Sequence, residues 1–105
     1  LTSRQLKRIL KRTGVGIART GGYTGHGSGE VMIGFTTANR IPSGREEELL
    51  QISAIPEHVI NRAFLAAAEA EQEAILNSMT AAKQTRGREG ELYYSLAEYL
   101  NDREA

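Results

Sequence analysis

The sequence predicts a mixed α/β (α+β) fold that is only part of a complete domain. Two long stretches carry apolar residues at helical spacing, and two short stretches between them resemble strands. A two-stranded sheet is only marginally stable by itself, and the apolar face of the first predicted strand needs a covering layer. We therefore expect residues 1–105 to form a single partial domain, with the remaining strands in a partner or in sequence outside this chain.

The composition excludes several classes of function. The 13 Lys and Arg residues balance 13 Asp and Glu residues, so no net charge draws the chain towards nucleic acid or an anionic membrane. The absence of cysteine excludes disulfides, thiolate metal sites and a cysteine nucleophile. No apolar run approaches the roughly 20 residues that span a bilayer, so we expect no membrane partner.

The chain starts at Leu1 with neither an initiator Met nor a signal-peptide pattern, which is typical of a processed or truncated product. The absence of cysteine does not fix the redox compartment. We favour the cytoplasm over the periplasm.

The first predicted helix runs from about residue 4 to residue 18, with Thr2 or Ser3 as its N-cap. Its apolar stripe recurs every three or four residues: Leu6, Ile9, Leu10, Thr13 and Ile17. Its other side is basic: Arg4, Lys7, Arg8, Lys11 and Arg12. Gly14 and Gly16 weaken the second half, and we expect the helix to continue through them because tight packing there leaves no room for a side chain.

Residues 19–30 are rich in glycine and form a predicted loop. A strand is predicted over residues 30–37, with Val31, Ile33 and Phe35 on one face. Gly34 in this strand indicates a close approach by another element. Residues 41–44 predict a turn, and residues 47–53 predict a second strand that Leu50 and Ile52 anchor.

The second long helix is predicted from Pro56 or Glu57 to Ala82, because proline suits a first helical turn. Its broad apolar face is rich in alanine, which implies close packing: Ile60, Phe64, Ala67, Ala68, Ile75, Met79 and Ala82. Residues 85–90 predict a loop. Ser95 is expected to cap a short last helix that carries Leu96, Tyr99 and Leu100.

The candidate catalytic residues are Ser28 and Glu30, in the turn Gly25-His26-Gly27-Ser28-Gly29-Glu30. In an extended segment, residues two apart point to one face, about 6 to 7 Å from each other. A hydroxyl and a carboxylate so placed can orient protons around a nucleophile supplied from elsewhere. From the spacing alone, an exposed bend that leads into an edge strand is the more common explanation.

Other chemistries fit less well. The glycine turn precedes a strand and lacks a Lys-Ser/Thr pair, unlike a phosphate-binding loop. His26 and His58 are the only histidines, and the chain has no cluster at metal-ligand spacing, so we expect no metal and no cofactor. The basic residues from Arg4 to Arg12 lack interleaved aromatic residues, which favours a solvated or subunit-contacting face over nucleic-acid binding.

Several blocks together carry a resemblance to a known family: residues 5–8, 16–21, 25–30 and 35–39. In that order they resemble the β-subunit of the L-aminopeptidase/D-Ala-esterase-amidase family, which includes the β-peptidyl aminopeptidases. The similarity is strongest over residues 4–40 and continues more loosely through the alanine-rich helix and the loop at residues 87–90.

The resemblance implies a precursor that cuts itself into α and β subunits and exposes a serine nucleophile at the new β N-terminus. It also implies a four-layer αββα sandwich, an α subunit as partner, and a homo-oligomer of αβ units that acts on peptide or amide substrates. Ser28 would hydrogen-bond near the terminal amine, and Glu30 would orient or polarise that network. The nucleophile would lie a strand's length ahead of Leu1, so residues 1–105 alone are expected to be inactive.

Two rival functions stay open at this point. The chain could be an interaction module that has lost its active site. It could also bind nucleic acid weakly through the basic face between Arg4 and Arg12. An Asn/Gly-Ser junction and an apolar strand ahead of Leu1 would favour the enzyme over the interaction module.

Overall fold

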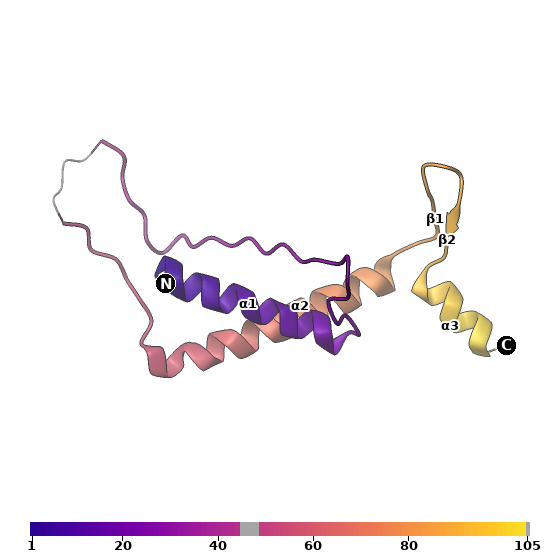
Figure 1. Cartoon of the computed structure of the whole chain (residues 1–105), viewed down its shortest axis with the longest axis horizontal. Coiled ribbons are helices and arrows are strands. Elements are labelled where there is room, and N and C mark those ends of the chain that lie inside the picture. The colour runs from indigo at the N-terminus through magenta and orange to yellow at the C-terminus, as the bar shows by residue number, and fades with distance from the viewer. Residues whose placement is uncertain (45–48, 105) are drawn as a thin grey trace. The chain divides into compact units, whose positions relative to one another are not determined.

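The computed structural model describes residues 1–44 and 49–104, and it mixes helices with one small sheet (Figure 1). The elements in chain order are α1 (Ser3–Arg19), the short 3-10 helix η1 (Glu57–Val59), α2 (Ile60–Ala81), β1 (Thr85–Arg86), β2 (Leu92–Tyr93) and α3 (Leu96–Glu104). The α/β character of the prediction is confirmed. None of the described helices combines the length and the apolarity that crossing a membrane requires.

The chain divides into two compact units, Leu1–Gln72 and Glu73–Ala105. The first unit holds α1, residues 20–44 and 49–56, which have no helix or strand, the 3-10 helix η1, and the start of α2. The second unit holds the end of α2, the sheet and α3. That residues 1–105 form a single, partial domain of a larger protein stays a prediction.

The N-cap of helix α1 is Thr2, one of the two predicted N-caps, which forms a capping box with Gln5. The Thr2 hydroxyl accepts a hydrogen bond from the backbone N–H of Gln5 at 3.1 Å, and the Gln5 side chain accepts one from the backbone N–H of Thr2 at 3.1 Å. These bonds satisfy two donors that a helix start otherwise leaves unpaired. The helix continues through both glycines to Arg19, one residue beyond the predicted end.

Within the first unit α1 packs closely against the start of α2. A Cβ at Gly16 would lie 2.5 Å from the backbone oxygen of Ala68, so only glycine fits at this crossing. Ile60 and Ala68 of α2 are buried, and the Arg12 guanidinium lies over the Phe64 ring at 3.9 Å. This contact explains why a glycine is tolerated inside α1, where it costs about 1 kcal/mol in helix propensity.

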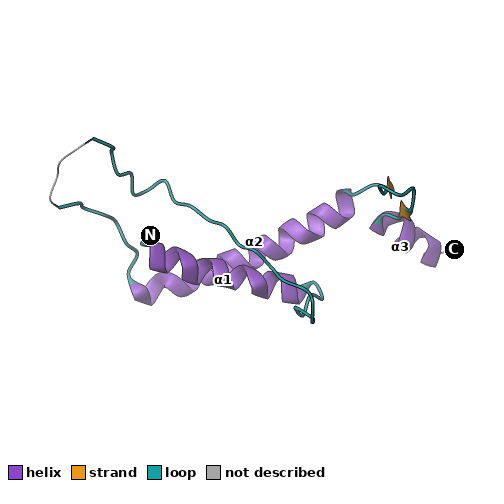
Figure 2. Ribbon diagram, turned by 45° about the horizontal axis from the view of Figure 1, so that its top comes forward, coloured by secondary structure: helices purple, strands orange, loops and turns teal. Residues whose placement is uncertain are grey.

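The predicted strand over residues 30–37 has no strand pairing among the described residues. The segment is extended and runs beside α1, but Figure 2 draws the described residues that follow α1, up to residue 44, as loop. A strand needs hydrogen bonds to a neighbouring strand, and none of the described residues supplies them. The predicted alternation is nevertheless present: Val31, Ile33 and Phe35 are 99%, 93% and 86% exposed, and the residues between them are half-buried.

The close approach predicted at Gly34 is confirmed. A Cβ on Gly34 would lie 2.8 Å from Cδ2 of Leu10 in α1. Met32 also faces α1, since its Cε would lie 3.5 Å from a Cβ on Gly14. One face of the extended segment therefore packs on α1, and its other, apolar face has no cover among the described residues.

Two side-chain amides tie the start of α1 to a second extended segment at residues 53–55. Asn39 accepts a hydrogen bond from Ser53 N (2.7 Å) and donates to Ser53 O (2.9 Å). Gln5 pairs in the same way with Ile55, accepting from its N (3.3 Å) and donating to its O (2.7 Å). Each amide thus makes the two bonds that a neighbouring strand would make, and we call the two together the amide clamp.

The second predicted strand, residues 47–53, is only partly observable. Residues 47 and 48 lie outside the described residues, and the rest of the stretch carries no strand pairing. Leu50 and Ile52, its expected anchors, are 53% and 54% exposed. As at residues 30–37, the alternating sequence lacks a partner strand within the described chain.

The second unit corrects the predicted loop at residues 85–90. Thr85 and Arg86 form β1, which pairs antiparallel with β2 through Thr85–Tyr93 and Arg86–Leu92. Only residues 87–91 form the connecting turn. Ser95 caps α3 as predicted: its hydroxyl accepts from Glu98 N at 3.2 Å, and Glu98 in return accepts from Ser95 N at 2.8 Å.

The helix crossing predicts different tolerance at two glycines of α1. In the whole protein, Gly16→Ala should lower the free energy of unfolding by about 1 to 3 kcal/mol, because the added methyl group collides with α2. Gly14→Ala is the matched control, since its Cβ meets only Met32 at 3.5 Å and a helical alanine is favourable. Urea unfolding followed by circular dichroism measures both; equal stability of the two variants would contradict the packing.

Candidate functional site

The glycine-rich turn begins where α1 ends. The Thr20 hydroxyl donates to Ile17 O at 2.8 Å, and Gly21 follows with a φ of 103°, which favours glycine. A second turn closes between Ser28 N and Gly25 O at 3.0 Å, and Gly27 within it has a φ of 82°. These bends return the chain towards α1 and place Ser28 and Glu30 near the C-terminal end of that helix.

The structure places both predicted site residues on the surface. Ser28 and Glu30 are exposed, and no hydrogen bond joins them. Among the described residues, the Ser28 hydroxyl has no hydrogen-bond partner, so it is available to a group from outside them. The roles of Ser28 and Glu30 stay predictions.

Thr24 is a site residue that the sequence did not indicate. Its hydroxyl donates to Oε1 of Glu30 at 3.1 Å and holds the carboxylate towards the turn. Thr24 also has a φ of 54°, in the left-handed region that a β-branched residue rarely adopts. Strain of about 1 to 3 kcal/mol in such a residue is common at functional sites, where the surroundings impose it. A threonine in a glycine-rich loop was the only signal in the sequence.

A groove of about 260 Å³ adjoins Glu30. Side chains of α1 form one wall, and the extended segment and Glu71 of α2 complete it. The lining residues are Leu10, Thr13, Ile17, Glu30, Val31, Met32, Ile33 and Glu71. The groove is therefore mostly apolar, with two carboxylates at its edges. Among the described residues, no group of three or more His, Asp or Glu is placed to hold a metal ion.

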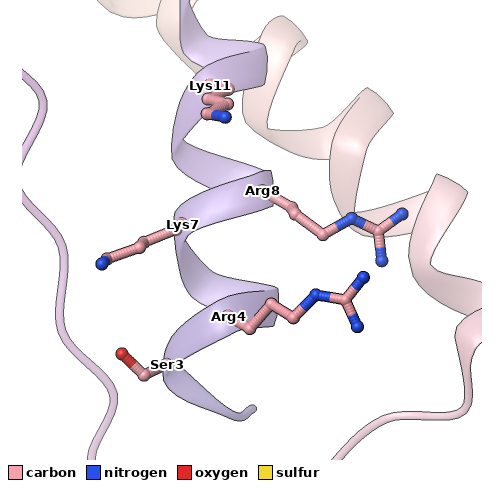
Figure 3. A pocket seen from close by; sticks show the side chains of 5 residues that line it. All are labelled: Ser3, Arg4, Lys7, Arg8 and Lys11. Carbon is pink, nitrogen blue, oxygen red and sulfur yellow. The ribbon is translucent and has the colours of Figure 1, made fainter.

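A larger groove, of about 550 Å³, lies along the basic side of α1 (Figure 3). Its lining residues are Ser3, Arg4, Lys7, Arg8 and Lys11. Arg8 is not free for a ligand, because it pairs with Glu57 and lies 5.3 Å from the centre of the Phe64 ring. The hydrogen bond from Arg8 holds the pKa of Glu57 below its ordinary value, and a weaker bond from Gln5 acts in the same direction.

Ser28 and Glu30 line no part of this basic groove. The groove borders the start of α1, whereas the glycine turn follows its end. The structure therefore does not bring the basic side chains together with the predicted site residues.

Comparison with known proteins finds a family whose model matches this chain, and relatives that are several times longer than it. Residues 1–93 match the model of peptidase family S58. A β-peptidyl aminopeptidase, BapA, of Sphingosinicella microcystinivorans is 34% identical over 86 residues, which are 82% of this chain and 22% of that protein. A BapA of Sphingosinicella xenopeptidilytica is 29% identical over 97 residues, or 91% of this chain and 24% of that protein.

A solved structure is similar over nearly the whole chain. The crystal structure of the PH0078 protein from Pyrococcus horikoshii OT3 is 47% identical and gives a TM-score of 0.87 over 98% of this chain and 29% of that one. The chain thus spans between about a fifth and a third of the length of these relatives.

The Arg8–Glu57 pair predicts a measurable titration. The pKa of Glu57 is lower in the folded protein than in the unfolded chain. The ionised carboxylate therefore stabilises the fold fully at pH values above its pKa in the unfolded chain, and this stabilisation is lost as the pH falls through its pKa in the folded protein. Arg8→Gln should raise the pKa of Glu57 towards 4.5, as measured by NMR titration of the whole protein. Lys11→Gln, which removes the same charge without touching Glu57, is the control; an unchanged Glu57 titration in Arg8→Gln would contradict the pairing.

Proposed function

The chain belongs to peptidase family S58, and on that basis we propose that it is the C-terminal part of a self-processing serine aminopeptidase. The whole protein would remove N-terminal residues from short peptides, amides or esters. The names of two relatives, both β-peptidyl aminopeptidases, support aminopeptidase activity.

One observation carries the proposal: Ser28 and Glu30 are both exposed in the turn that follows α1, and the Thr24 hydroxyl donates to the Glu30 carboxylate. Thr24 has a left-handed φ of 54°, and residues in such conformations cluster at functional sites, which supports the proposal. The exposed Ser28 hydroxyl is free to bond a group that lies outside the described residues.

The proposed nucleophile is a serine ahead of Leu1, exposed as a new N-terminus when the precursor cuts itself. Its Oγ attacks the substrate carbonyl carbon while its proton passes to its own α-amino group. The C–N bond then breaks, and the leaving amine takes that proton. Water releases the acyl group in the same manner, again with the amine as base. Ser28 would hydrogen-bond near the amine, and Glu30 would favour its protonated form during the transfer.

The dimensions of the first unit support this arrangement. Helix α1 has 17 residues and is about 26 Å long, and the extended segment from Glu30 to Thr36 spans about 20 Å back along it before the chain bends at residues 37–39. A strand lying beside this segment would need at least about six residues to reach from the level of Thr36 to the level of Glu30. That is a strand's length, the separation at which the nucleophile is expected.

The exposed face of Val31, Ile33 and Phe35 supports the proposed architecture. In a four-layer αββα sandwich this face would lie against further strands, some of them from the α subunit, and several αβ units would assemble into an oligomer. Three large apolar side chains at 86% exposure or more are otherwise costly on a surface.

Neither rival function gains a specific observation. An inactive interaction module does not account for the way Thr24 holds Glu30. The basic face of α1 offers fewer free charges to nucleic acid than its sequence suggests, because Arg8 and Arg12 are engaged with Glu57 and Phe64. We propose no nucleic-acid partner.

The proposal predicts a large loss of activity from small changes in the turn. In the whole αβ protein, Ser28→Ala and Glu30→Gln should each lower kcat for an aminoacyl p-nitroanilide by about 10²-fold or more, because proton transfer loses a positioned group. His26→Ala, an exposed change in the same turn, is the control and should keep nearly the full rate. Wild-type rates in Ser28→Ala and Glu30→Gln would contradict the proposed roles.

A further inference from the structure

We infer that Asn39 is a positioning residue that sets how far the proposed nucleophile strand extends towards Ser28 and Glu30. This inference rests on the proposed function, because it concerns the chain that enters α1 from the nucleophile. It adds a residue far from the reaction to the groups on which the rate depends.

Asn39 and the Ser53 carbonyl hold the point at which the chain enters α1, since Leu1 N also donates to Ser53 O at 3.0 Å. Its Nδ2 donates to Leu1 O at 2.8 Å and to Ser53 O at 2.9 Å, while its Oδ1 accepts from Ser53 N at 2.7 Å. The donor and acceptor atoms of the amide are therefore all used, and they join three segments far apart in the sequence. No other side chain in the described part of the chain bonds to the Leu1 backbone.

Gln5 supports the same region without contacting Leu1. It is 4% exposed, pairs with both polar groups of the Ile55 backbone, and accepts from Thr2 N. Its amide thus holds the helix to residue 55, whereas the Asn39 amide holds the residue that precedes the helix cap. The two halves of the amide clamp are similar in chemistry and differ in which part of the chain they fix.

Asn39 also ends the bend at residues 37–39, which follows the extended segment that begins at Glu30. A strand entering at Leu1 and the segment from Glu30 to Asn39 would therefore both finish at this one amide. Each strand residue advances about 3.3 Å, so a slip of one residue at Asn39 would move the nucleophile by that distance relative to Ser28 and Glu30. A misplacement of about 1 Å can cost 10²-fold in rate. Loss of the hydrogen bond from the Asn39 side chain to Leu1 O should therefore lower the rate of the reaction.

The test uses the whole αβ protein and compares Asn39→Ala and Asn39→Asp with Gln5→Ala. Aspartate keeps an acceptor for Ser53 N but has no N–H for Leu1 O. Both Asn39 variants should lower kcat for an aminoacyl p-nitroanilide by about 10²-fold with KM within about twofold. Gln5→Ala should lower the melting temperature at least as much as Asn39→Ala, with a smaller loss of kcat.

The pH profile separates positioning from a merely structural role. A carboxylate near an amine raises the amine's pKa, so an amine moved away from Glu30 should titrate lower. The acid limb of kcat should therefore move to lower pH in both Asn39 variants and stay in place in Gln5→Ala.

Five outcomes would overturn the inference. Asn39 variants with wild-type kcat would refute it and leave the proposed function intact. An unshifted pH profile would show that Asn39 is only a structural residue. A loss of kcat that parallels the fall in melting temperature in all three variants would show the same. Failure of both Asn39 variants to fold would have the same meaning. A wild-type protein that hydrolyses no aminoacyl p-nitroanilide would refute the proposed function and, with it, this inference.

Discussion

The side-chain amides of Asn39 and Gln5 form hydrogen bonds to the backbone of residues 53 and 55 of the kind that a neighbouring strand would form. The arrangement of the first unit depends on these hydrogen bonds. Asn39 and Gln5 each satisfy one backbone N–H and one C=O, on residues two apart and hence on the same edge of the extended segment. The same two side chains bond the chain at Leu1 and Thr2. The amide clamp thereby fixes the start of α1, and the extended segment that returns along α1 is held at Asn39. The glycine turn lies at the opposite end of that segment.

The helices could be predicted from the sequence because their signals are local. Thr2 and Gln5 have capping-box spacing, and the apolar residues of α1 and α2 recur at helical intervals. The predicted ends of α1 are within one residue of the observed ones. The predicted end of α2 is also within one residue, but its predicted start at Pro56 or Glu57 is wrong, because the 3-10 helix Glu57–Val59 precedes α2. The glycines at 16 and 34 also predicted close contacts, which the structure finds with Ala68 and Leu10. The strands could not be confirmed in the same way. Alternation at residues 31–35 is real, but a strand also needs a hydrogen-bonding neighbour, and no described residue provides one.

The candidate site was predictable in part for the same reason. Ser28 and Glu30 stand out because two chemically useful side chains lie two residues apart among glycines. Thr24 was missed because its bond to Glu30 depends on the path of the turn, including a left-handed φ that no sequence rule assigns to threonine. Asn39 was missed because its partners, Leu1 and Ser53, are distant in the sequence. In each case the proposed role depends on a contact that the fold creates, whereas the roles proposed for Ser28 and Glu30 depend on their own functional groups.

The central claim is that the extended segment after Glu30 is a strand of a larger sheet, which brings a nucleophile from outside residues 1–105 beside Ser28 and Glu30. Amide hydrogen exchange of the whole αβ protein tests it most directly, because protection reports hydrogen bonding of each backbone N–H. The account predicts that amides between residues 31 and 37 exchange orders of magnitude more slowly than in an unstructured peptide. Exchange at unstructured rates throughout this segment would contradict it.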